Sequence, residues 1–162
     1  MRALLRPLLS RLVAACREEY GDRLVSIVVF GSAGRGTSGP DSDLDLLVVA
    51  DDLPGGRVAR VRQFIDVERR LEPELRGARL AGWNVELSPV LKAPAEVDQG
   101  SPLFLDMLDD AQFLYDRDDF MRRALESLRA RLAALGARRV WRGNAWYWDL
   151  KPDYRPGDVF EI

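Results

Sequence analysis

Two apolar runs joined by a short glycine-rich segment constrain the fold of this chain more than any other feature. The first run, residues 24–30, is rich in valine and isoleucine and ends at Gly31-Ser32, and the second opens with Asp43-Leu44-Asp45 and continues to residue 50. Both have the length and residue types of buried β-strands. Because alternate residues of a strand project from one face, Asp43 and Asp45 are predicted to project together where the second strand begins.

Composition limits the size of the molecule and the chemistry that it can perform. The chain has 162 residues, of which 47% are hydrophobic, so one domain, or a small domain with an extension, can bury a sizeable core. It has no histidine, which excludes a histidine general base, a Ser-His-Asp triad and a histidine-ligated zinc site. A single cysteine excludes an intrachain disulfide.

Charge and hydropathy bear on location and partners. The formal net charge of −2 gives no overall attraction to nucleic acid or anionic membranes. No segment approaches the roughly 20 consecutive apolar residues of a bilayer-spanning helix, so we expect a cytoplasmic protein without membrane association.

Apolar periodicity predicts the other elements. Helices are expected at about residues 3–20, 58–72, 101–111 and 119–135, with the second ending before Pro73 and the last capped by Asp118 or Asp119. Residues 83–91 are predicted to form a third strand and residues 113–115 a short one. We divide the chain into a core, residues 1–100, and a C-terminal extension, residues 101–162, which is mainly helical and ends in a tail rich in tryptophan and arginine.

Two common phosphate-binding patterns match the glycine-rich segment by spacing only. Gly34, Gly36 and Gly39 fit the dinucleotide fingerprint, but a proline and a strand follow where that fingerprint opens a helix. Gly31 and Gly36 have the spacing of a P-loop that lacks its lysine. Gly31-Ser32 is different, because a glycine directly after a buried strand lets backbone N–H groups approach a phosphate. The alternative is an ordinary turn.

The acidic residues indicate a metal site. Asp43 and Asp45 on one strand face repel each other, so one takes up a proton unless a cation lies between them, and Mg²⁺ prefers a few carboxylates together with a substrate's phosphates. Glu86 interrupts an apolar strand and completes a cluster if that strand lies beside the second one. The alternatives are turn chemistry before a strand for the aspartates and a solvent-facing position for Glu86.

Together these residues resemble the minimal nucleotidyltransferase domain of the DNA polymerase beta superfamily. The resemblance covers about residues 1–92 and is carried by residues 30–36 (Phe-Gly-Ser-Ala-Gly-Arg-Gly), 42–46 (Ser-Asp-Leu-Asp-Leu) and 85–87 (Val-Glu-Leu). Gly34 stands where the family commonly has alanine, a change of one small residue for another. The resemblance implies an α/β (α+β) fold, a mixed sheet flanked by helices.

The same resemblance implies an activity and its residues. Two Mg²⁺ ions would be held by Asp43, Asp45 and Glu86, with Glu86 on the metal nearest the acceptor, and the triphosphate of ATP or another NTP by Gly31, Ser32 and Arg35. An acceptor hydroxyl would attack the α-phosphate, and pyrophosphate would leave. Stand-alone domains of this kind resemble the antitoxins that pair with HEPN-domain toxins. Some of these antitoxins transfer AMP to a tyrosine of the toxin.

Several alternatives remain open at this stage. The fold could serve a non-catalytic antitoxin or a nucleotide-sensing module. The tail, with Trp141, Trp146 and Trp148 among several arginines, could be a clip packed on the core, or a surface for an acceptor or partner. Nucleic-acid binding through the tail is disfavoured by the near-neutral net charge. Because the chain is short, association with a partner chain or with further copies of itself is also compatible with the sequence.

Overall fold

A mixed four-stranded sheet forms the centre of the computed structural model, which describes residues 2–143 and 145–159. Its strands lie in the order β3 (Leu87–Lys92), β2 (Leu44–Ala50), β1 (Leu24–Val29), β4 (Gln112–Asp116). The central strand β1 is antiparallel to both neighbours, whereas β3 is parallel to β2. The predicted mixed sheet is therefore confirmed. Residues 144 and 160–162 of the predicted extension lie outside the described part.

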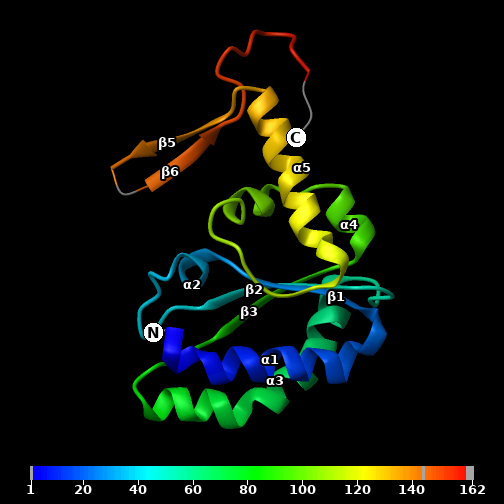
Figure 1. The fold of residues 1–162 in the computed structure, drawn as a ribbon, viewed down its shortest axis with the longest axis vertical. Coiled ribbons are helices and arrows are strands. Elements are labelled where there is room, and N and C mark those ends of the chain that lie inside the picture. The colour runs from blue at the N-terminus through cyan, green and yellow to red at the C-terminus, as the bar shows by residue number, and fades with distance from the viewer. Residues whose placement is uncertain (1, 144, 160–162) are drawn as a thin grey trace.

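Helices cover both faces of this sheet (Figure 1). On one face lie α1 (Arg2–Tyr20) and α3 (Arg57–Leu80), and on the other α4 (Pro94–Asp98), the 3₁₀ helix η2 (Pro102–Asp106) and α5 (Phe120–Ala134). Short helical turns η1 (Gly21–Arg23), α2 (Gly31–Arg35) and η3 (Arg117–Asp119) follow α1, β1 and β4. None of the helices within the described ranges combines the length and the apolar content that a bilayer crossing requires.

Strand alternation divides the core into two apolar clusters. Ile27, Leu46 and Val48 pack with α1 and α3, while Val28 and Leu47 pack with η2 and α5. All five side chains are fully buried. The sheet thus has no solvent-facing side along its two central strands, which explains why both read as continuous apolar runs.

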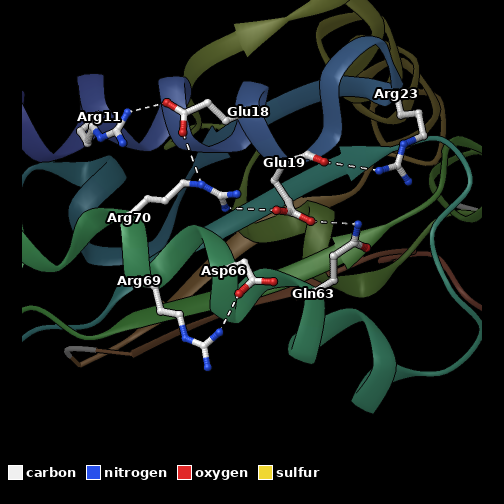
Figure 2. A network of polar contacts seen from close by, with 8 residues as sticks. All are labelled: Arg11, Glu18, Glu19, Arg23, Gln63, Asp66, Arg69 and Arg70. Atoms are coloured by element: carbon white, nitrogen blue, oxygen red, sulfur yellow. Dashed lines mark hydrogen bonds and ion pairs between the residues drawn. The ribbon is translucent and has the colours of Figure 1, made fainter.

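Ion pairs hold the two helices of the first face together (Figure 2). Arg70 of α3 reaches two residues of α1, with its Nε 3.3 Å from Glu18 Oε2 and a terminal nitrogen 3.1 Å from Glu19 Oε2. Gln63 donates to the other oxygen of Glu19 at 3.4 Å. These contacts connect α1 and α3 beside the apolar residues that the two helices bury against each other. Because partly exposed ion pairs add little to the free energy of folding, their main effect is to fix the register of α1 on α3.

Several predicted boundaries were wrong. Helix α3 continues through Pro73 to Leu80, because Leu75 and Ala78 extend its buried stripe beyond the proline. Strand β3 begins only at Leu87, since the preceding backbone turns outward and Asn84 N–H donates to Pro40 O at 2.8 Å. The helix predicted at 101–111 is the short 3₁₀ helix η2, and the helix α4 was not predicted.

The tail differs most from expectation. The extension was expected to be mainly helical, but its tail contains an antiparallel hairpin of β5 (Arg138–Arg142) and β6 (Ala145–Asp149), which projects from the body beyond the end of α5 (Figure 1). Alternation is hard to see here because each face mixes aromatic and charged residues: Trp141 and Trp148 share one face with Arg139, whereas Tyr147 shares the other with Arg138 and Arg142. The upstream part of the same extension supplies β4, an edge strand of the central sheet.

One carboxylate joins β1, β4 and α5. Asp116, whose side chain is only 4% exposed, accepts hydrogen bonds from Met121 N–H at 3.0 Å and Arg122 N–H at 3.1 Å. The hydroxyl of Ser26, the one buried polar residue of the described core, donates to the same carboxylate at 2.5 Å. Asp116 therefore caps α5, whereas the predicted cap Asp119 makes no capping hydrogen bond.

We therefore expect Asp116→Ala to cost about 2–3 kcal/mol of unfolding free energy, because it removes a helix cap and leaves the Ser26 hydroxyl buried without an acceptor. Chemical denaturation would measure the loss. Asp119→Asn is the matched control, since asparagine tolerates its positive φ and no cap is lost, and its cost should stay below about 0.5 kcal/mol. Equal costs for the two variants would contradict the assignment of Asp116 as the cap.

Candidate active site

The turn after β1 brings backbone against a carboxylate. Gly31 has φ +63°, a left-handed conformation that favours glycine, and a Cβ placed on it would lie 2.1 Å from Asp45 Oδ2. The N–H of Phe30 donates to the carbonyl of Asp45 at 3.1 Å, so the end of β1 is fastened to the start of β2. The predicted neighbours Gly31 and Asp45 are thus in direct contact, and only a residue without a side chain fits between them.

The glycine-rich connection begins with one short helical turn. In α2 the N–H of Gly34 donates to Phe30 O at 3.2 Å, and Gly36, at φ +76°, ends the turn. Thr37 N–H then closes back on Ser32 O at 2.9 Å. Ser32 is therefore held on an ordered turn next to Asp45, rather than on a loose loop.

Gly34 is required by a contact that the sequence did not reveal. A Cβ at this position would lie 2.1 Å from the carbonyl oxygen of Asp110, which precedes β4. Arg35 reaches the same residue, with a terminal nitrogen 3.2 Å from Asp110 Oδ2. The glycine found where the family commonly has alanine thus allows the Asp110 backbone to press against α2, and Arg35, predicted to meet phosphate, forms an ion pair beside it.

The electrostatics of the site centre on Asp45. Burial of its carboxyl raises its pKa above the ordinary value, and the neighbouring charge of Asp43 raises it further. Arg35 lowers the pKa of the same group, and Asp106 of η2 raises it slightly. Asp106 was missed by the sequence analysis, because it lies in no motif and approaches the site only through the fold.

Glu86 lies one strand away from this pair. Its carbonyl accepts from Leu44 N–H at 2.8 Å, and the parallel register pairs Leu44 with Leu87 and Asp45 with Ser88. The side chain is exposed and borders a groove between α3 and β3. Over residues 2–143 and 145–159, no three acidic or cysteine side chains lie close enough to form a metal-binding group. The structure thus brings Asp43 and Asp45 together, and the role of Glu86 as a third ligand stays a prediction.

The contact between Gly31 and Asp45 is testable by a pair of glycine substitutions. Both Gly31→Ala and Gly36→Ala place a side chain at positive φ, which costs about 1 kcal/mol, but only Gly31 has a neighbour within 4 Å. We expect Gly31→Ala to lower the unfolding free energy by about 1–3 kcal/mol more than Gly36→Ala does, because its side chain collides with Asp45. Chemical denaturation would measure both variants. Repeating Gly31→Ala in an Asp45→Ala background should remove that excess; an unchanged excess would contradict the contact.

The raised pKa of Asp45 predicts that ionisation of this carboxyl destabilises the folded protein. A carboxyl whose pKa is higher in the folded state destabilises the fold as pH rises through the interval between its unfolded and folded pKa values. In metal-free buffer at pH 7, Asp45→Asn should therefore raise the melting temperature by about 1–3 °C. The gain should vanish below about pH 4, where the wild-type carboxyl is protonated in both states. A lower melting temperature for the variant at pH 7 would contradict this electrostatic account.

Comparison with known proteins identifies the family of this chain. A family model described as "Nucleotidyltransferase domain" matches residues 9–104. A Methanocaldococcus jannaschii protein named "Putative protein adenylyltransferase MJ1305" is 32% identical over 128 residues, which cover 78% of this chain and 82% of that protein.

Two solved structures align more distantly. One, described as a toxin-antitoxin with AMP-PNP, has a TM-score of 0.47 and 20% identity over 79% of this chain and 92% of its own. Another, described as the toxin-antitoxin MntA-HepT, has a TM-score of 0.45 and 15% identity over 81% and 92%. The family match alone spans more than half of the chain and includes Gly31, Asp43, Asp45 and Glu86, so this protein belongs to the nucleotidyltransferase domain family and is a nucleotidyltransferase.

Proposed function

We propose that this nucleotidyltransferase transfers AMP from ATP to a hydroxyl group of a protein, in a reaction that depends on Mg²⁺. The observation that carries the proposal is the contact between the Gly31 backbone and the Asp45 carboxylate, which brings the turn after β1 against one of the two acids. The choice of AMP and of a protein acceptor is supported by the name of the Methanocaldococcus jannaschii relative.

The acidic pair fits a divalent cation. Burial and the neighbouring charge of Asp43 both raise the pKa of Asp45, so a cation between the two carboxylates would relieve an existing repulsion. Their oxygens are the ligands that Mg²⁺ prefers, with Glu86 proposed as the third. When bound, the metal supplies charge stabilisation for the phosphate oxygens of the reacting nucleotide.

The other residues of the site would bind and orient the nucleotide. Backbone N–H groups of the turn that begins at Gly31 would bind a phosphate, and Ser32 offers a hydroxyl donor beside them. Arg35 is a surface ion-pair partner of Asp110, so its guanidinium is already held near the acids and contributes positive charge toward a triphosphate.

In the proposed reaction an acceptor oxygen attacks the α-phosphorus in line with the leaving group. The new phosphorus–oxygen bond joins AMP to the acceptor, the bond to the β-phosphate oxygen breaks, and pyrophosphate departs with that electron pair. The acceptor hydroxyl releases its proton. No histidine is needed for this chemistry, which suits a chain that has none.

A HEPN-domain toxin is the acceptor that we propose, in line with the antitoxins that the motif residues resemble. Transfer to such a partner would silence it covalently. The same fold could also silence a partner by binding alone, and the two modes differ in whether Asp43 and Asp45 are needed.

The decisive variant is Asp43→Asn combined with Asp45→Asn. With ATP labelled at the α-phosphate, Mg²⁺ and the HEPN-type product of a neighbouring gene, we expect the wild type to label the acceptor and the double variant to lose at least about 1,000-fold in rate, because both proposed metal ligands lose their charge. Gel autoradiography and mass spectrometry of the acceptor would measure transfer. Glu86→Gln should also slow transfer if Glu86 is the third ligand.

A matched control is Asp66→Asn, which removes an exposed carboxylate of α3 that pairs only with Arg69 and should leave the rate unchanged. Omission of Mg²⁺ or addition of a chelator should abolish labelling by the wild type. Full labelling by the double variant would overturn the proposal. Silencing of the toxin by the double variant, with no label transferred, would assign the protein to the binding mode instead.

A further inference from the structure

The hairpin β5–β6 carries two of the three large aromatic side chains that are exposed among the described residues; the third is Tyr154. Trp141 is 62% exposed and Tyr147 is 50% exposed. We propose that this hairpin is the docking surface for the protein acceptor, an inference that rests on the proposed function above. The partner that fits it has an acidic surface with apolar side chains around it.

The base of the hairpin is fastened to the body of the molecule. Trp148 and Leu150 pack partly buried against the apolar cluster of α5, and Arg139 lies 3.3 Å from Asp109 Oδ2. Asp109 is itself 3.6 Å from Arg129 of α5. A two-stranded hairpin is marginal by itself, so these anchors are what hold the strands in a defined orientation.

The aromatic side chains are presented on both faces of the outer part. Arg139 lies over the Trp141 ring, 5.2 Å from its centroid, which restricts the orientation of the indole. Tyr147 pairs with Val140 and projects from the opposite face. Preordered aromatic groups of this kind lose little entropy on binding and dominate protein–protein interfaces.

The anchor of the hairpin adjoins the support of the nucleotide site. Asp109, which holds Arg139, is followed in the chain by Asp110, which pairs with Arg35 and presses against Gly34. The hairpin extends toward the side of the molecule where α2 lies (left in Figure 1). A partner bound to the hairpin is therefore held on the side of the molecule that carries Gly31, Asp43 and Asp45.

Charge indicates the chemistry of that partner. The two strands carry three arginines against one aspartate, in a chain whose net charge is −2. Arg138 pairs with Asp149 and Arg139 with Asp109, whereas Arg142 forms no ion pair with any described residue. One uncompensated cation among exposed aromatics suits an acidic protein surface better than a nucleic acid, which is bound through many phosphate contacts.

The test uses the full chain, ATP labelled at the α-phosphate, Mg²⁺ and a lysate of the organism whose genome encodes the protein. The variant Trp141→Ala with Tyr147→Ala should reduce labelling of the protein acceptor by at least about 30-fold, as expected for two central interface aromatics. The stabilisation by a non-hydrolysable ATP analogue, measured as a melting-temperature shift, should remain that of the wild type. Val58→Ala with Leu80→Ala, which trims two exposed apolar residues of α3, should change neither quantity.

A second variant tests charge without trimming an aromatic. Arg142→Glu should reduce labelling by about tenfold and Arg142→Lys by much less, and raised salt should narrow the difference between them. Wild-type labelling by the aromatic variant would overturn the docking proposal alone. Label that is removed by ribonuclease would overturn it in favour of an RNA acceptor. Absence of any label with the wild type would overturn the proposed function, and the docking proposal with it.

Discussion

The site depends on the close approach of Gly31 to Asp45. The backbone at Gly31 can take its left-handed conformation against a carboxylate only because no side chain intervenes, and the hydrogen bond from Phe30 N–H to Asp45 O keeps the two segments in register. The turn that we propose to bind phosphate and the acid that we propose to bind a cation thereby lie in direct contact. The raised pKa of Asp45 shows the cost of this arrangement, since the fold holds a carboxylate where its charge is disfavoured.

Support for that contact comes from the C-terminal half of the chain. Asp110 backs α2 through its carbonyl and its carboxylate, and Asp109 next to it holds the hairpin. Asp116, a few residues on, fastens the central strand to the start of α5. Three aspartates within residues 109–116 thus connect the central sheet, the turn after β1 and the projecting hairpin to one another.

The sequence predicted the parts of the site that depend on local pattern. Gly31, Asp43 and Asp45 follow from strand ends and alternation, both of which are visible in consecutive residues. The prediction failed where segments distant in the sequence meet. Gly34 is needed because the Asp110 carbonyl presses against it, and Asp106 approaches Asp45 only through η2. Asp116, rather than Asp119, caps α5 from the strand beside β1, where it also accepts the hydrogen bond of Ser26. The end of α3 was predicted too early, because the low helix propensity of Pro73 reflects the hydrogen bond that proline removes but not the burial of residues that follow it.

The order of the sheet has a consequence during synthesis. Strand β1 lies between β2 and β4, but β4 ends at Asp116, more than eighty residues after β1. Until that residue has left the ribosome, the nascent chain carries a valine-rich strand with one open hydrogen-bonding edge and with the Ser26 hydroxyl lacking its acceptor. Open edges of this kind pair with other chains. Between the emergence of β2 and the arrival of β4, this edge of β1 is thus open to pairing with another chain.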